Sequence, residues 1–275
     1  MMTEIPFYDF GGAGERLHFA HSNGFPPASF KALLGALALD YRVLAMELRP
    51  LWAGYEPEEL DNWNVVADDL LRFLDQQGWE NIIGMGHSLG AVATMMAALK
   101  EPERFKVLVL VEPVFLPPPL LEMAAAHPGA AEMIPLVKAT RRRRYEWPDE
   151  AAMFAHFRKK ETFVRWSDEA LWDYVRAGSE AGGAGVQLRY RRDWEARFYS
   201  LPPTTVWADI PQIKVPTMGV RGALSDTIAP ESWALWQELQ PEGHFVEMAE
   251  AGHMVPVERP FALADTIKSY LTGMV

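Results

Sequence analysis

The sequence predicts an α/β fold: a mostly parallel central sheet flanked by helices on both faces, with an inserted helical cap. Three observations lead to this prediction. Short apolar segments alternate with amphipathic segments along most of the chain, which is the pattern of a parallel sheet covered by helices. The segment "IIGMGHSLGAVATMMAAL", residues 82–99, joins a strand pattern directly to a helix pattern. Between residues 117 and 205 the alternation stops.

Composition limits the class of protein. With 275 residues, 49% hydrophobic and 23% charged, the chain is long enough for one large core plus an insertion. The absence of cysteine excludes disulfides and thiol nucleophiles. The net charge of -11 argues against nucleic acid as a partner. The first residues lack a basic leader, and no apolar run approaches the roughly 20 residues that span a bilayer. We therefore expect a cytoplasmic protein with no membrane partner.

The candidate strands and helices of the core occupy residues 1–116 and 206–275. "TEIPFYDF" and "ERLHFAH" flank a glycine-rich turn at 11–14 and predict an opening hairpin. Later strands are predicted at "YRVLAMEL", "NIIGMGH", "KVLVLVEP", "PTMGVRG" and "HFVEMAEAG". Helices are predicted near 28–39, 61–77, 89–100, 230–240 and 257–271. Asp61 or Asn62 has the side chain expected at the N-cap of the second helix.

Residues 117–205 are rich in proline, glycine and aromatic residues and predict a helical cap without a buried strand. "DEAAMFAHFRKKET" and "DEALWDYVRAGSE" have helical composition. The segment carries 14 Lys and Arg against 12 Asp and Glu, whereas the rest of the chain carries 12 against 25. The charge contrast either attracts anionic substrates to the cap or reflects an ordinary solvated surface. The same two interpretations apply to the four consecutive arginines at 141–144.

The motif "GHSLG", residues 86–90, predicts a nucleophile on a sharp turn between strand and helix. In such a turn the residues two places on either side of the serine must lack bulk, and Gly86 and Gly90 occupy those places. The turn would expose Ser88 Oγ at the carboxyl edge of the sheet, beside the amino end of a helix. A dinucleotide-binding motif would need a third glycine where Leu89 stands. A purely structural turn remains the other alternative.

A serine nucleophile needs a base and a carboxylate. Of seven histidines, His253 is the candidate base, because it follows the last apolar run on a loop at the sheet edge where Ser88 lies. His87 is expected to be packed or hydrogen-bonded instead. Asp226, in the loop after "PTMGVRG", is the favoured carboxylate, and Glu112 at the end of "KVLVLVEP" is its rival.

These motifs resemble those of the alpha/beta-hydrolase superfamily, in which serine, acid and histidine follow in that order. The matching pieces are "GHSLG", "RGALSD", "AGHMVPVERP" and "HSNGFP". The resemblance implies an oxyanion hole made by the backbone N–H groups of Phe25 and Leu89, with His21 and Asn23 in support. It covers residues 1–116 and 206–275 and leaves the cap unmatched.

The resemblance implies a serine hydrolase that cleaves a small-molecule carboxylic ester through an acyl-enzyme on Ser88. Hydrolysis of a carbon–carbon bond or a lactone on the same triad is the alternative, and so is a non-catalytic ligand receptor on this fold. No cofactor or metal is expected, because no His-Glu-x-x-His pattern occurs. The oligomeric state is left open. Four cap aromatics either line a substrate pocket or pack the cap onto the core: Trp147, Phe154, Phe157 and Trp166.

Overall fold

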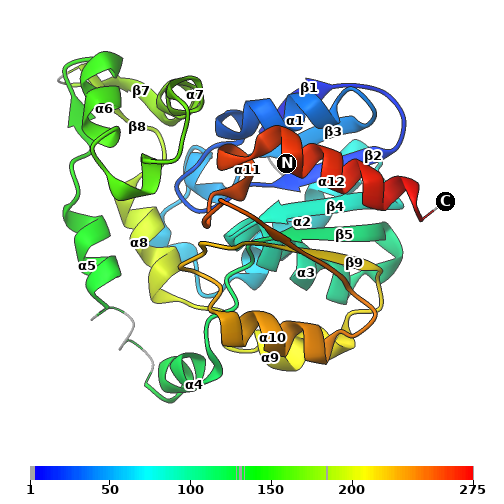
Figure 1. Cartoon of the computed structure of the whole chain (residues 1–275). Helices are drawn as coiled ribbons and strands as arrows, with labels where there is room; N and C mark the ends of the chain where they lie inside the picture. Colours follow the sequence, from blue (N-terminus) through cyan, green and yellow to red (C-terminus); the bar gives the residue numbers. More distant parts are fainter. Residues whose placement is uncertain (1–3, 128, 130–131, 133, 184, 275) are drawn as a thin grey trace.

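A computed structural model describes residues 4–127, 129, 132, 134–183 and 185–274 of the chain. Within these residues the centre of the molecule is a seven-stranded sheet in the order β1-β3-β2-β4-β5-β9-β10 (Figure 1). Its strands, in chain order, are β1 (Phe7–Gly11), β2 (Arg16–Ala20), β3 (Arg42–Met46), β4 (Ile82–His87), β5 (Phe105–Val111), β9 (Thr217–Gly222) and β10 (His244–Met248). The predicted α/β fold is confirmed.

All neighbours in the sheet are parallel except β1, which runs antiparallel to β3. The predicted opening hairpin is therefore wrong, since β2 pairs with β3 and β4 and not with β1. Burial explains the difference. Four of the five residues of β2 are buried, as in a strand with neighbours on both sides, whereas no residue of β1 is buried. The glycine-rich turn thus carries the chain from an edge strand to the sheet interior.

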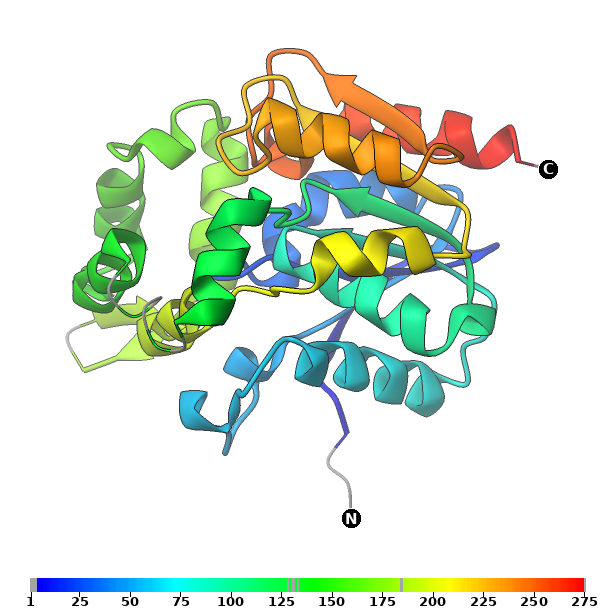
Figure 2. The same cartoon turned by 90° about the horizontal axis from the view of Figure 1, so that it is seen from below.

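Helices cover both faces of the sheet (Figures 1 and 2). One face carries α1 (Lys31–Leu37), α11 (Val255–Glu258) and α12 (Pro260–Thr272). The other carries α2 (Asn64–Gln77), α3 (Leu89–Lys100), α9 (Val206–Asp209) and α10 (Pro230–Leu239). Each layer has its own apolar cluster against the sheet, which is why the interior strands β4 and β5 are buried along almost their whole length.

The predicted helices agree with these elements to within a few residues. The segment predicted as one helix at 257–271 is two, because the chain breaks at Arg259 before Pro260. The predicted N-cap of α2 at Asp61 or Asn62 is wrong, because the N-cap is Trp63, which makes no side-chain cap hydrogen bond. Asn62 Oδ1 nevertheless accepts a hydrogen bond at 2.9 Å from the N–H of Asn64, the first residue of the helix.

The segment predicted as a cap, residues 117–205, lies at one end of the sheet in both views (green in Figures 1 and 2). Its helices are α4 (Pro118–Ala126), α5 (Pro135–Arg142), α6 (Glu150–Phe157), α7 (Asp168–Gly178) and α8 (Arg192–Ser200). The segment also holds a small antiparallel sheet, β6-β8-β7, with β6 (Glu146–Trp147), β7 (Ser179–Gly182) and β8 (Gly185–Leu188). The sequence predicts no buried strand in this segment, and these three strands are short and mostly exposed or half-buried. Strands of two to four partly exposed residues are too short for a hydrophobic pattern to reveal.

The described part of the chain contains no helix with the length and apolarity needed to cross a membrane.

Two buried histidines mark the sheet interior. His18 in β2 is fully buried against Phe73, and neither of its ring nitrogens has a hydrogen-bond partner among the described residues. His21 is also fully buried, and its Nε2 accepts from the Leu48 N–H at 3.0 Å. Burial lowers the pKa of His18 to about 3 and that of His21 to about 4. Both side chains are therefore neutral in the folded protein near neutral pH.

The buried neutral histidines should make the protein less stable in mild acid. Unfolded His18 takes up a proton near pH 6.5, whereas folded His18 does so only near pH 3. Each such histidine contributes stability above pH 6.5 that is lost as the pH falls, by about 1.4 kcal/mol per pH unit. His18→Leu should reduce the pH slope of the unfolding free energy by about that amount, measured by urea denaturation between about pH 6 and 4.5. His127→Gln, at an exposed position, is the control, and an unchanged slope in His18→Leu would contradict the argument.

Candidate active site

Ser88 stands at the turn between β4 and α3 in a conformation that few residues adopt. Its φ is 57° and its ψ is -119°, outside the regions that L-residues normally occupy. The glycines on either side allow the turn. A Cβ on Gly86 would lie 2.3 Å from the Gly90 carbonyl oxygen, and a Cβ on Gly90 would lie 2.1 Å from that of Ala20. Both distances are impossible for non-bonded atoms, so the close approach of helix and strands requires glycine here.

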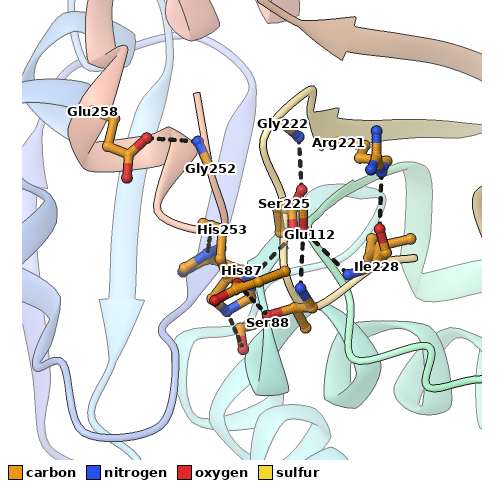
Figure 3. A network of polar contacts seen from close by, with 12 residues as sticks. His87, Ser88, Glu112, Arg221, Gly222, Ser225, Ile228, Gly252, His253 and Glu258 are labelled. Carbon is orange, nitrogen blue, oxygen red and sulfur yellow. Dashed lines mark hydrogen bonds and ion pairs between the residues drawn. The ribbon is translucent and has the colours of Figure 1, made fainter. Parts of the chain in front are cut away.

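His253 brings the serine and a carboxylate together. It lies in the loop between β10 and α11, and its Nε2 is 3.1 Å from Ser88 Oγ. Its Nδ1 is 3.0 Å from Glu112 Oε2. Figure 3 shows the imidazole between the two side chains. Since a carboxylate can only accept, Nδ1 is the donor to Glu112 and Nε2 is left to accept the serine proton.

The carboxylate beside His253 is Glu112 and not Asp226, which corrects the favoured prediction. Asp226 is exposed, and its Oδ1 accepts a long hydrogen bond of 3.4 Å from the Thr227 hydroxyl. Glu112 is fully buried directly after β5 and has a positive φ of 49°. The unusual backbone turns its side chain across the end of β9 toward the histidine loop. The order of the strands in the sequence does not show in which direction the Glu112 side chain points.

Sequence reasoning also missed Ser225, which holds Glu112 in place. Glu112 Oε1 accepts from the Gly222 N–H and Oε2 accepts from Ser225 Oγ, both at 2.6 Å. Ser225 Oγ in turn accepts from the Ile228 N–H at 3.1 Å, and Arg221 Nε donates to the Ile228 carbonyl at 2.9 Å (Figure 3). The motif "RGALSD" thus braces the carboxylate through its serine. The available signal was the position of Ser225 within the motif "RGALSD", one residue before the favoured Asp226.

His87, the residue before Ser88, lies under the catalytic histidine candidate. It is fully buried, and its Nε2 is 2.9 Å from the His253 carbonyl oxygen. The two ring centroids are 4.9 Å apart. Burial, and secondarily the proximity of His253, holds the pKa of His87 well below its ordinary value. Nε2 therefore donates to the carbonyl, and His87 is hydrogen-bonded as the sequence predicted.

The two predicted oxyanion donors have different environments. Leu89 is the first residue of α3, where an N–H has no acceptor within the helix. The Phe25 N–H makes a long hydrogen bond of 3.3 Å to the Ser22 carbonyl. Asn23 fixes this loop from beneath, because its Nδ2 donates to the Glu195 carbonyl at 3.1 Å and its Oδ1 accepts from Tyr190 at 2.9 Å. Together with the His21 contacts, these bonds hold the segment "HSNGFP".

An ion pair within residues 117–205, between a buried glutamate and a half-buried arginine, borders the same loop. A Cβ on Gly24, whose φ is +83°, would lie 3.2 Å from the carboxyl carbon of Glu195. Glu195 Oε1 accepts from Arg143 Nη1 at 2.9 Å. Burial raises the pKa of Glu195, while the Arg143 charge opposes that shift. Arg143 belongs to the run of arginines at 141–144, and its guanidinium points toward the buried Glu195 and not toward solvent.

The predicted pocket aromatics are divided between the site and the interior of the cap. Trp166 lies against Phe25 with ring centroids 5.8 Å apart, so it borders the candidate oxyanion loop. Phe157 does not contact Phe25 directly but packs on Tyr174, which does. Trp147 packs on Phe157, and Phe154 stacks on Trp172 within the cap. Sequence reasoning missed two rings that contact Phe25, namely Phe163 and Tyr174.

Among the described residues, no group of three or more histidine, aspartate or glutamate side chains is arranged to hold a metal ion.

A known protein family matches most of the chain. The model of the Alpha/beta hydrolase family matches residues 19–266. The chain therefore belongs to this family of hydrolases, and the resemblance inferred from the motifs is confirmed.

The relatives and solved structures that the chain resembles include different kinds of hydrolase. The chain is 32% identical over 107 residues to strigolactone esterase D14 of Arabidopsis thaliana, covering 36% of this chain and 39% of the relative. It is 29% identical over 118 residues to bifunctional epoxide hydrolase 2 of Sus scrofa, covering 38% and 21%. The chain thus matches well under half the length of these relatives. The crystal structure of E-2-(acetamidomethylene)succinate hydrolase superposes with a TM-score of 0.79 at 20% identity, covering 97% of this chain and 94% of that one.

The turn at Ser88 should not tolerate a side chain at Gly90. Gly90→Ala should lower the unfolding free energy by about 3 kcal/mol, because the new methyl group would push the helix from the strands. Gly35→Ala is the matched control, since a Cβ at Gly35 in α1 would meet nothing within 4 Å and should stabilise by about 0.5–1 kcal/mol. Urea denaturation measures both. Equal stabilities for the two variants would refute the packing argument.

Proposed function

We propose that this chain is a serine hydrolase that cleaves carboxylic esters through an acyl-enzyme on Ser88. The observation that carries the proposal is the continuous contact from Ser88 Oγ through His253 to Glu112. In this proposal residues 1–116 and 206–275 are the hydrolase core, and residues 117–205 are a cap domain over its active site. His253 is the general base, and Glu112 takes the role first expected of Asp226.

Acylation begins when His253 Nε2 accepts the Ser88 proton as Oγ attacks the ester carbonyl carbon. The carbonyl oxygen becomes an oxyanion that accepts from the N–H groups of Leu89 and Phe25. The long Phe25 bond to Ser22 is the one exchanged for this contact. Collapse breaks the bond to the leaving alcohol, which receives the proton from His253. The nucleophile remains acylated.

Deacylation repeats these steps with water. His253 Nε2 removes a proton from the water as its oxygen attacks the acyl carbon, and the second oxyanion is held by the same two N–H groups. Collapse releases the acid and returns the proton to Ser88. Throughout, Glu112 keeps the ring orientation and stabilises the imidazolium that forms twice in each cycle.

A cluster of apolar rings beside the oxyanion loop supports an ester with an apolar acyl or aromatic group. Phe25, Phe163 and Trp166 are in mutual ring contact there. A serine nucleophile distinguishes this site from the aspartate nucleophile that epoxide hydrolysis would require. Lactone opening and carbon–carbon bond hydrolysis use the same triad and are the alternatives to test beside esters.

The first test is hydrolysis of p-nitrophenyl esters from acetate to laurate by the unmodified chain and by Ser88→Ala. The unmodified chain should show a chain-length optimum, and Ser88→Ala should lose at least about 10⁴-fold in kcat, because the nucleophile is gone. An enol lactone and a vinylogous diketone are assayed in parallel. Turnover of only one of these would replace the ester assignment, and no turnover by the folded chain would favour a ligand receptor.

The role of Glu112 is tested by Glu112→Gln against Asp226→Asn. Glu112→Gln should lower kcat by about 10³–10⁴-fold, because an amide can present the wrong group to His253 Nδ1. Asp226→Asn should stay within about twofold, since its side chain is exposed and forms its hydrogen bond with Thr227 and not with His253 or Glu112. Thermal unfolding shows whether each variant is folded, and Ser225→Ala is the milder replacement if Glu112→Gln is not. The reverse ranking would return the role to Asp226.

A further inference from the structure

One turn of the cap contacts both halves of the proposed active site. The turn comprises residues 163–166, directly before Ser167 and α7, and we call it the contact turn. Its Trp166 lies against Phe25, a proposed oxyanion donor. Its Arg165 lies on the backbone just before His253, because a Cβ on Gly252 would fall 2.2 Å from Arg165 Nη2. The contact turn therefore meets the oxyanion loop and the base loop at the same time.

A buried carboxylate joins Arg165 to the base loop. Glu258 Oε2 accepts from the Gly252 N–H at 2.6 Å and from Arg165 Nε at 3.1 Å. Figure 3 shows the first of these bonds. The Glu258 side chain is 2% exposed, whereas that of Arg165 is 39% exposed. A buried carboxylate without a countercharge is costly, and the cap supplies that charge to the core.

The main chain around His253 is consequently held on two sides. The N–H of the preceding Gly252 binds Glu258, and the His253 carbonyl binds His87. The His87 bond lies within the core, since both residues belong to it. The Glu258 bond alone involves a side chain whose countercharge comes from the cap. The position of the cap is thereby linked to the position of His253 through the carboxylate of Glu258.

The contact turn is itself firmly built. Arg158, at the end of α6, donates through Nη1 to the Phe163 carbonyl at 2.9 Å and to the Trp166 carbonyl at 3.0 Å. Its Nη2 donates to the Ser167 carbonyl at 3.2 Å. One guanidinium thus binds two carbonyls of the contact turn and the carbonyl of Ser167 directly after it. The contact turn can therefore dock on the core as a rigid unit. Such rigidity is needed if the turn is to hold catalytic side chains in position.

We propose that Arg165 and Glu258 are positioning residues that align His253 with Ser88 when the cap is docked. Trp166 fixes the oxyanion loop in the same event. The inference rests on the proposed function and deepens it: the base is aligned only while the contact turn lies on the core. Displacement of the cap would leave Glu258 without its countercharge and release the Gly252 N–H, so the histidine loop would lose one of its two attachments.

The kinetic test compares Arg165→Gln with Arg191→Gln. Arg191 also joins the cap to the core, through a bidentate pair with Glu56, and is the matched control. Arg165→Gln should lower kcat for the best p-nitrophenyl ester by about tenfold with KM within about twofold, because misalignment affects the chemical step. Arg165→Lys should recover part of the loss. Arg191→Gln should change neither constant beyond about twofold, and an equal loss of kcat in both variants would overturn the proposal.

Hydrogen exchange of the Gly252 amide provides a readout that needs no substrate. In Arg165→Gln and Glu258→Gln this amide should exchange at least about tenfold faster than in the unmodified chain, and in Arg191→Gln it should not. Unchanged exchange in Arg165→Gln would refute the link between cap and base loop. If the unmodified chain is exchange-protected at Gly252 but hydrolyses no ester, the proposed function fails, while the exchange data still decide the link.

Discussion

The hydrogen bonds of the Glu112 carboxylate are the constraint on which the site depends. Glu112 follows β5, and its three donors come from the end of β9, the loop beyond it and the loop after β10. A buried carboxylate is costly unless it is well supplied with donors. Its burial thus requires all three segments to converge. Parallel strands make the convergence possible, because their carboxyl ends meet at one edge of the sheet.

The sequence predicts those parts of the site that depend on local pattern. Ser88 is identifiable because the glycine spacing, the strand and the helix all lie within residues 82–100. His253 is identifiable because it follows the last strand. The acid is not, because the choice between Glu112 and Asp226 depends on a positive φ and on Ser225 from another loop. Likewise, the sequence does not show that β1 pairs with β3 instead of β2. That pairing depends on which strands are buried in the whole sheet, and a short segment carries no such information.

The charge contrast between cap and core corresponds to contacts between them. Three cap arginines pair with core glutamates: Arg165 with Glu258, Arg189 with Glu47 and Arg191 with Glu56. Lys31 and Asp173 form a pair of the opposite sense. Exposed pairs of this kind add little stability. Glu47 and Glu258 are nearly buried, however, so the cost of leaving them unpaired favours one placement of the cap. Part of the basic excess therefore orients the cap and is not free to attract substrate.

In the proposed reaction the two neighbouring histidines of the site have different roles: His87 anchors the histidine loop, and His253 transfers the proton. His87 is buried beneath His253, and its lowered pKa keeps it neutral, so in that reaction it would not compete for the proton of Ser88. A neutral imidazole whose donor nitrogen binds the His253 carbonyl can still anchor the loop. A charged residue at position 87 would instead oppose the imidazolium that the proposed reaction forms next to it. Position 87 therefore suits a group that donates one hydrogen bond and carries no charge. Burial gives His87 this property, because it keeps the imidazole neutral.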